Sequence, residues 1–444
     1  MDAREVALLT LNACERQGGW SDGVLKKQIA AAGLDSRDAG LATQLCFGVI
    51  QNRILLDFYL SKFSNIPLRR LEGKVLQALR LGLYQMLFLT RIPHSAAVDQ
   101  SVALTRAHCK NPRAPGMVNA ILRNLERSLD RLPTIPEDDP AEYYATLYSH
   151  PVWLVRELLE TLGSEGTAAF LQADNSQPPI TAMVNTVKTG LEGALEALQA
   201  EGVHGEPHPW LKNCLVLSRS GSLEELDAFQ NGLFYVQDPA SRLAVMALDP
   251  EPGSRVLDMC AAPGGKSFAA AIQMKDQGEI WSCDLHPHKK TLIQKGAQRL
   301  GLTCIRPQTA DGKVRRPEWE GTFDRVLVDA PCSGLGVIRK KPDIRFKDPE
   351  PLSGLPQVQS AILDNAAGYV KPGGVLVYST CTILERENRA VTDAFLAAHP
   401  EFSRERFLLP GPAGEVSEGQ ITLWPQVHGT DGFYICKLRK DGEA

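Results

Sequence analysis

The second half of the chain alternates short apolar runs with helical stretches, and this alternation most restricts the possible folds. The apolar runs occupy residues 254–260, 278–284, 304–310, 323–330 and 373–380. Apolar strands separated by helices are typical of βαβ units, in which helices cover both faces of a parallel sheet. We therefore expect residues 234–444 to form a Rossmann-like α/β domain, with 421–440 as a hairpin at the sheet edge.

The first 130 residues show a different periodicity, because their apolar residues recur every three or four positions. This spacing predicts helices within 6–17, 41–63, 68–90, 95–109 and 116–129. We expect an all-α domain over 1–132. The proline-rich, acidic stretch 131–140 predicts a linker. Residues 141–233 mix helical and strand patterns, which favours a small α+β domain like an RNA recognition motif.

Composition and charge limit the classes of protein to which this chain can belong. The chain is 43% hydrophobic and 23% charged, as in globular proteins. Its net charge of −4 is uneven, because residues 1–130 sum to +6, 131–240 to −11 and 241–444 to +1. The basic first segment admits an anionic partner such as nucleic acid, although ordinary charge variation explains it as well.

Other sequence features concern membranes, metals and compartment. The chain has no run of 18 apolar residues, and its N-terminus carries acids early, unlike a secretory signal. The ten cysteines include no C-x-x-C pair. We therefore expect a cytoplasmic protein with free thiols, no membrane segment and no metal site.

The first expected strand of the α/β domain runs into a glycine loop, CAAPGGKS at 260–267. Gly264 and Gly265 allow a sharp turn close to a ligand, and the following helix presents free N–H groups. A phosphate-binding loop would share the end of this motif, but Cys260 stands where its first glycine belongs. A nucleoside cofactor lying across the strand ends is the other possibility.

Three acids support the nucleoside cofactor. Asp284, Asp311 and Asp329 follow successive expected strands, and Asp284 lies 19 positions after Gly265. An acid near this spacing binds ribose hydroxyls in nucleotide-binding folds. A dehydrogenase stays possible, but the loop lacks the G-x-G-x-x-G order. S-adenosylmethionine fits better, since it has no pyrophosphate.

Two thiols lie at the same strand ends. Cys332 sits in a shaped loop, DAPCSG, and Cys381 ends the strand LVYST. A single cysteine at the end of a strand is more often a core residue than a catalytic one. Two cysteines at the same sheet edge as Asp329 indicate instead that the thiols take part in a reaction. A thiolate that adds to carbon 6 of a pyrimidine makes carbon 5 nucleophilic toward a methyl donor. Asp329 can hold the exocyclic amine and N3 of a flipped cytosine.

The chain also resembles a known family. LDMCAAPGGK, LVDAPCSGLG, PDIRF, LVYSTC and HGTDGFY are similar to the motifs of RNA (cytosine-C5) methyltransferases, and the helical N-terminus resembles NusB-like RNA-binding domains. The resemblance implies a class I methyltransferase domain that uses S-adenosylmethionine. It also implies 16S rRNA as substrate, naked or in an early assembly intermediate, and a monomeric enzyme.

The resemblance further implies roles for individual residues. Cys381 would be the nucleophile, and Cys332 would assist release of the methylated product. The residues expected to contact the cofactor are Cys260, Ala261, Ala262, Pro263, Gly264, Gly265, Lys266, Asp284, Asp311 and Asp329. Lys266 would face the cofactor carboxylate or the RNA, although it could also be a solvated lysine.

Basic residues follow the Cys332 loop directly. Those expected to neutralise RNA phosphates are Arg339, Lys340, Lys341 and Arg345, unless they form a solvated loop. Phe346 stands where this family often has tryptophan. His428 is left out of the catalytic set. A non-catalytic RNA-binding or ribosome assembly factor is the main alternative function, and a P-loop NTPase is a further one.

Overall fold

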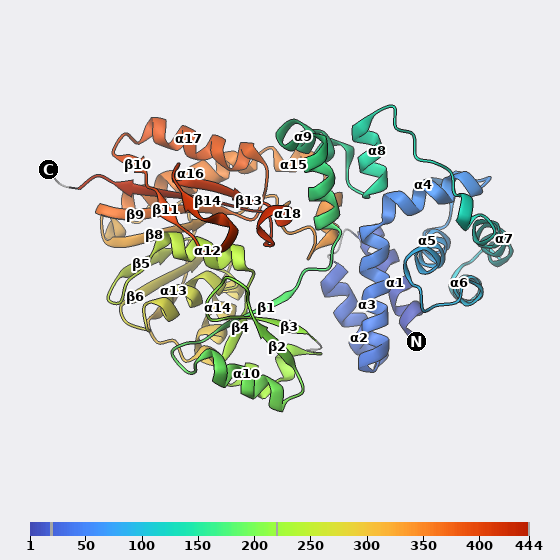
Figure 1. The fold of residues 1–444 in the computed structure, drawn as a ribbon, viewed down its shortest axis with the longest axis horizontal. Coiled ribbons are helices and arrows are strands. Elements are labelled where there is room, and N and C mark those ends of the chain that lie inside the picture. Colours follow the sequence, from blue (N-terminus) through green and yellow to red (C-terminus); the bar gives the residue numbers. More distant parts are fainter. Residues whose placement is uncertain (18–20, 219–220, 443–444) are drawn as a thin grey trace. The chain divides into compact units, whose positions relative to one another are not determined.

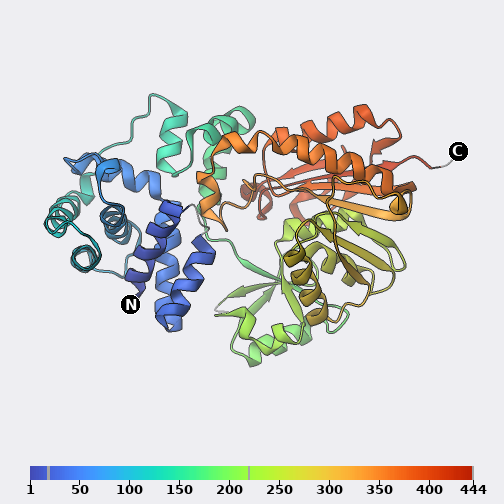
Figure 2. The ribbon, with the colours of Figure 1, turned by 180° about the vertical axis from the view of Figure 1, so that it is seen from behind.

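The computed structural model describes residues 1–17, 21–218 and 221–442, and the chain divides into two compact units (Figures 1 and 2). Unit 1 contains residues 1–176 together with 340–347. Unit 2 contains 177–339 and 348–444. The division into three domains with the boundaries given above stays a prediction. Within these predicted domains, residues 18–20, 219–220 and 443–444 lie outside the described residues. In the described parts of the chain, no helix is long and apolar enough to cross a membrane.

Unit 1 is helical, as predicted. Its helices are α1 (Ala3–Gln17), α2 (Ser21–Ala32), α3 (Ser36–Gln51), α4 (Arg53–Phe63), α5 (Gly73–Phe88), α6 (His94–His108), α7 (Ala114–Glu126), α8 (Pro140–Leu147) and α9 (Val152–Asp174). Helix α5 is buried from Val75 to Met86, so the other helices pack around it. The stretch 41–63 is not one helix, because Asn52 leaves the helical conformation and its side chain caps Gly48 O at 2.9 Å.

A small antiparallel sheet opens unit 2. Its elements are β1 (Ile180–Val184), α10 (Leu191–Ala200), β2 (His204–Pro207), β3 (Cys214–Ser218), α11 (Asp227–Gln230) and β4 (Phe234–Val236). The strand order β2-β3-β1-β4 with this βαββαβ succession is the ferredoxin-like arrangement. The prediction of a small α+β domain is confirmed.

The large sheet has the order β10-β14-β9-β8-β5-β6-β7. Its strands are β5 (Arg255–Asp258), β6 (Glu279–Asp284), β7 (Ile305–Thr309), β8 (Phe323–Asp329), β9 (Val370–Thr380), β10 (Phe402–Arg404) and β14 (Phe433–Lys440), and β13 (Gln420–Leu423) pairs with β14. Strands β5 to β9 are parallel, whereas β14 is antiparallel to β9. The predicted parallel sheet and terminal hairpin are confirmed.

Helices cover both faces of this sheet (Figures 1 and 2). One core joins Val256 to α12 (Pro239–Leu248), α13 (Gly265–Gln273) and α14 (Pro287–Leu300). The next residue, Leu257, enters a second core with α16 (Leu355–Tyr369) and α17 (Arg389–Ala398). Because successive strand side chains point to opposite faces, a strand buried on both sides must be apolar throughout. This requirement explains the continuous apolar runs of the sequence.

Candidate active site

A cavity of about 200 Å³ lies at the carboxyl ends of β5 and β8. Strand β5 has β6 on one side and β8 on the other, so this is the switch point where open α/β sheets bind ligands. The predicted cofactor residues that line the cavity are Cys260, Ala261, Ala262, Pro263, Gly265, Lys266 and Asp329. The lining residues that the sequence analysis missed are Val236, Gln237, Asp238, Ser241 and Asp258.

The glycine loop is shaped by Gly264. Its φ of +112° is a conformation that L side chains rarely adopt, and a Cβ there would meet the Phe268 ring at 2.4 Å. Helix α13 therefore begins directly against the cavity wall at Gly265. Gly264 shapes the loop without being among the residues that line the cavity.

Asp258, at the end of β5, is a site residue that the sequence analysis did not select. Its side chain is buried, and Oδ2 accepts a hydrogen bond of 2.7 Å from the Ser267 hydroxyl. Burial raises the pKa of Asp258 to about 7. Oδ1 has no hydrogen-bond partner among the described residues. An acid inside an otherwise apolar strand was the available sequence signal.

These groups fit S-adenosylmethionine. Asp238, Asp258 and Asp329 supply carboxylates, whereas Lys266 is the cation of the lining set. An acidic cavity suits a cofactor that carries a sulfonium and an ammonium group, and the unpartnered Asp258 oxygen can accept from the ammonium. The small side chains of Ala261 and Gly265 leave space for the bound group.

The two predicted thiols lie together. Cys332 Sγ and Cys381 Sγ are 3.3 Å apart, and both cysteines are free and partly buried. The hydrogen bond from Cys332 lowers the pKa of Cys381, and the nearby Lys266 ammonium lowers it further. The pKa of Cys332 is raised well above its ordinary value, first by this hydrogen bond and then by burial. Cys381 is therefore the thiol with more thiolate character.

Lys266 connects the thiol to the acid. Its Nζ is 2.7 Å from Asp329 Oδ2, and its side chain is only 11% exposed. Asp329 Oδ1 accepts a second hydrogen bond from the Ser379 hydroxyl at 2.8 Å. Lys266 is thus not a solvated lysine, and its contact with the cofactor carboxylate or the RNA stays a prediction. It is a buried cation beside Asp329 and Cys381.

Backbone contacts hold the Cys332 loop against Cys381. Gly336 N–H donates to Cys381 O at 2.9 Å, and Gly336 packs so closely that a Cβ would lie 1.8 Å from Gly432 O. Next to Cys332, the N–H of Ser333 donates to the buried Glu387 carboxylate at 2.9 Å. The loop therefore has a fixed shape, and Glu387 is a supporting residue that no motif indicated.

Two predicted cofactor acids do not line this cavity. Asp284 ends β6 and accepts from the His286 N–H at 3.2 Å, with Lys289 Nζ at 3.5 Å. Asp311 follows β7 and accepts from the Lys313 N–H at 2.9 Å. Both lie after parallel strands at the same sheet edge as Asp329, so their ribose contacts stay a prediction.

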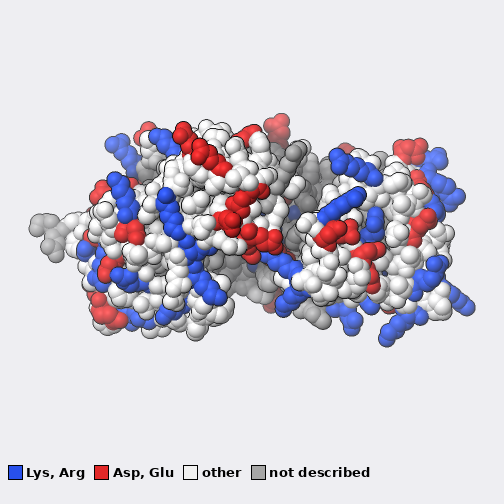
Figure 3. Space-filling model, turned by 90° about the horizontal axis from the view of Figure 1, so that it is seen from below, with Lys and Arg blue, Asp and Glu red and all other residues white. Residues whose placement is uncertain are grey.

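The predicted phosphate-binding residues separate. Arg339 is only 5% exposed and pairs with Asp431 at 2.8 Å and Asp238 at 3.4 Å. Lys340 is half-buried, and Lys341 is exposed. On the face drawn in Figure 3, lysines and arginines are interspersed with acids. Of these three, Lys341 is the residue best exposed to an RNA phosphate.

Arg345 belongs to unit 1 and is fully buried. Its guanidinium donates to Gln51 O at 2.7 Å, Ser149 O at 3.0 Å and Asn175 Oδ1 at 3.0 Å. Burial lowers its pKa to about 10. Arg345 cannot reach an RNA phosphate in this structure, so we drop it from the RNA contacts and assign it to the packing of unit 1.

The fold and the site together define the class of protein. The sheet is parallel with an antiparallel strand at one side, and the acidic cavity at its switch point is lined by groups that fit S-adenosylmethionine. These features define a class I methyltransferase that uses S-adenosylmethionine. Residues 245–439 match the 16S rRNA methyltransferase RsmB/F family, 1–127 the NusB family and 150–224 the RsmF/B-like ferredoxin-like domain. The chain belongs to the RsmB/F family of 16S rRNA methyltransferases. This membership decides against the P-loop and the dehydrogenase.

Individual relatives agree over the whole chain. The chain is 40% identical over 446 residues to the probable ribosomal RNA small subunit methyltransferase B of Bacillus subtilis (strain 168), which covers 99% of both proteins. It resembles the crystal structure of PH0851 with a TM-score of 0.81 and 26% identity, covering 99% of each chain. The structure of NSun6 from Pyrococcus horikoshii with SFG covers 67% of this chain and 100% of that one, at a TM-score of 0.59. With 22% identity, it shows the fold alone.

The charge of Lys266 leads to a testable pH dependence. Removing this cation in Lys266→Met should raise the pKa of Cys381, because the thiolate loses an opposite charge. The pH midpoint for alkylation of Cys381 by iodoacetamide should then move up by about one unit. Mass spectrometry of the alkylated peptide across pH measures this shift. Lys295→Met, at an exposed lysine of the same unit, is the matched control; an equal midpoint in both variants would contradict the assignment.

Proposed function

We propose that this protein transfers a methyl group to carbon 5 of a cytosine in 16S rRNA through a covalent adduct with Cys381. The observation that carries the proposal is the Cys332–Cys381 pair, 3.3 Å apart, beside the Lys266–Asp329 ion pair. Methylation of a base nitrogen or a ribose oxygen does not require a thiolate. Carbon 5 of cytosine does, because it is too weak a nucleophile without prior addition at carbon 6.

The chain's own residues account for the steps. The Cys381 thiolate adds to carbon 6 and N3 takes up a proton, so the negative charge entering the ring is neutralised. Asp329 holds the cytosine through this N3 proton and through the exocyclic amine. Bound S-adenosylmethionine supplies an electrophilic methyl group. After the carbon 5 proton is lost to a base, the sulfur–carbon 6 bond breaks and its electrons return to Cys381. The hydrogen bond from Cys332 stabilises the departing sulfur.

Lys266 has a supporting part in this scheme. Its ammonium forms an ion pair with Asp329 and helps to lower the pKa of Cys381, which favours the nucleophilic thiolate. It donates at 2.7 Å to one Asp329 oxygen, so cytosine binding requires the carboxylate to share its oxygens between Lys266 and the base. The exposed Lys341 and the half-buried Lys340 are proposed as RNA phosphate contacts. The substrate is proposed to be naked 16S rRNA or an early assembly intermediate, bound by a monomer.

The experiment that tests this function is bisulfite sequencing of 16S rRNA from a strain lacking the gene, beside its parent. We expect one cytosine that resists deamination in the parent to become convertible in the deletion strain. The purified protein should restore resistance on rRNA from that strain. An unchanged bisulfite pattern would contradict cytosine-C5 methylation.

A non-catalytic assembly factor is the second candidate, favoured by the large NusB-like unit. It predicts that 16S rRNA binds but receives no methyl group. Isothermal titration with S-adenosylmethionine separates the candidates, because an assembly factor has no need for the acidic cavity and should give no heat of binding.

A further inference from the structure

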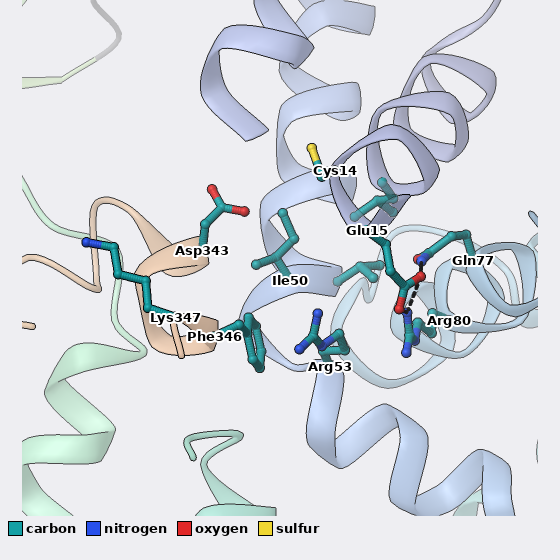
Figure 4. A pocket seen from close by; sticks show the side chains of 11 residues that line it. Cys14, Glu15, Ile50, Arg53, Gln77, Arg80, Asp343, Phe346 and Lys347 are labelled. Atoms are coloured by element: carbon teal, nitrogen blue, oxygen red, sulfur yellow. Dashed lines mark hydrogen bonds and ion pairs between the residues drawn. The ribbon is translucent and has the colours of Figure 1, made fainter. Parts of the chain in front are cut away.

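A second cavity, of about 350 Å³, lies within unit 1. Its described lining residues come from α1, α3, α4, α5 and the segment 342–347, and none of them lines the active-site cavity (Figure 4). Leu11, Val49 and Ile50 form an apolar wall. The volume lies in the range of small-ligand sites, which are mostly apolar with a few converging polar groups.

Arg53 is the polar group of this cavity that lacks a partner. Its guanidinium stacks on the Phe346 ring, 3.4 Å from the centroid (Figure 4). Stacking holds the guanidinium plane and leaves its N–H groups free for hydrogen bonds within that plane. Arg53 makes no hydrogen bond or ion pair with any residue that the structure describes. The neighbouring Arg80 differs, because Glu15 and Asp57 neutralise it at 3.1 and 2.7 Å.

The charges around the cavity argue against a phosphate ligand. The lining carries three cations, Arg53, Arg80 and Lys347, and two acids, Glu15 and Asp343. Arg80 is also paired with Asp57 outside the lining, so little positive charge is left for an anion. Burial and the like charge of Arg80 lower the pKa of Arg53. A lining that offers both donors and a carboxylate acceptor suits a neutral ring with polar edges better than an anion.

The wall that carries Asp343 and Phe346 is fixed before any ligand binds. Asp343 accepts hydrogen bonds from the Ser21 N–H, at 3.2 Å, and from the Ser21 hydroxyl. Between them in the chain, Ile344 and Arg345 are buried, and Arg345 is held by the acceptors described above. A preformed pocket spends little of its binding free energy on ordering side chains.

We propose that this pocket binds one unpaired base of the RNA substrate, with the apolar wall against the ring and Arg53 and Asp343 at its polar edges. Single-stranded RNA is recognised by bases that are splayed out, stacked on side chains and hydrogen-bonded at their edges. The inference rests on the proposed function, because it takes the ligand from the RNA substrate. It gives the NusB-like unit a base-reading site, held in part by residues that follow the Cys332 loop in the chain.

The first test compares Arg53→Lys with wild type in binding of in vitro transcribed 16S rRNA. Lysine keeps the charge but loses the planar fork, so reading of a base edge should fail and the Kd should rise about tenfold. The matched control is Arg37→Lys on α3, at an exposed arginine in the same unit, which should bind like wild type. Retained affinity in Arg53→Lys, with a wild-type melting curve, would overturn the proposal.

The second test needs no variant. Ultraviolet crosslinking of the wild-type protein to the same RNA, followed by mass spectrometry, should give nucleotide adducts on peptides that contain Cys14 or Phe346. Adducts elsewhere in unit 1 and none at these residues would overturn the proposal. The proposed function and the proposed pocket fail separately. If Arg53→Lys binds the RNA more weakly but the wild-type protein methylates no cytosine, the function is rejected. If the wild-type protein methylates cytosine but Arg53→Lys binds the RNA as tightly as wild type, the pocket is rejected.

Discussion

The Cys381→Ala protein is expected to lose methyl transfer to 16S rRNA by at least about a thousandfold, because removal of a covalent nucleophile costs several orders of magnitude. Alanine cannot add to carbon 6, and carbon 5 then stays too weak a nucleophile. Affinity for S-adenosylmethionine should remain, since Cys381 is not among the residues lining the cofactor cavity. Incorporation of radiolabelled methyl groups measures the first effect, and isothermal titration measures the second.

Cys109→Ala is a suitable control for the loss of a partly buried thiol, because Cys109 is the C-cap residue after α6 in unit 1. It should methylate at the wild-type rate. Normal turnover by Cys381→Ala would instead show that this thiol is a packing residue. Cofactor binding by an inactive Cys381→Ala protein would separate the loss of chemistry from a loss of folding.

The Cys332→Ala protein should accumulate a covalent complex with RNA that survives denaturing electrophoresis. We expect the Cys332 thiol, 3.3 Å from Cys381 Sγ, to donate a hydrogen bond that stabilises the Cys381 thiolate both as it attacks and as it departs. Without this donor, the sulfur–carbon 6 bond should break more slowly than it forms. Labelled 16S rRNA that migrates with the protein band measures the trapped adduct.

The double variant Cys332→Ala, Cys381→Ala controls for nonspecific crosslinking and should give no band. Cys332→Ser should trap less complex than Cys332→Ala, since a hydroxyl can still donate to the departing sulfur. Absence of a covalent band in Cys332→Ala, together with normal turnover, would leave Cys332 without a part in product release.

The sheet was predictable from local sequence. The apolar run 254–260 contains β5. The run 373–380 lies wholly within β9 and misses only the first three residues of that strand, 370–372. A strand that is covered on both faces is apolar at every position, so a short continuous apolar segment is enough to locate it in the sequence. The break at Asn52 was not predictable in the same way, because apolar residues continue across it and a side-chain cap ends the helix.

The sequence predicted most of the residues of the site but not the hydrogen bonds and ion pairs between them. The spacing of the motifs brought Cys332, Cys381 and Asp329 to one sheet edge. The hydrogen bond between the thiols and the ion pair of Lys266 depend on side-chain directions that spacing does not specify. Asp258 was missed because its apolar run continues through Met259 to the glycine loop, and its burial and unpartnered oxygen appear only in the structure.

The basic segment shows the limit most clearly. In the sequence, Arg339 to Arg345 are a charged loop beside the active site. Arg345 is instead buried by acceptors as far as 294 positions away in the chain, and Arg339 lies between two carboxylates. Whether a charged side chain meets solvent or a partner depends on residues that are distant in sequence.

The sequence by itself determined the order of elements, the parallel sheet and the edge at which its functional residues gather, because these follow from local periodicity and from chain direction. The tertiary structure decided which thiol has the lowered pKa, which cation lies beside it, and which of the predicted basic residues are exposed. Those properties are set by burial and by the nearest charges, and both exist only once distant segments of the chain have packed together.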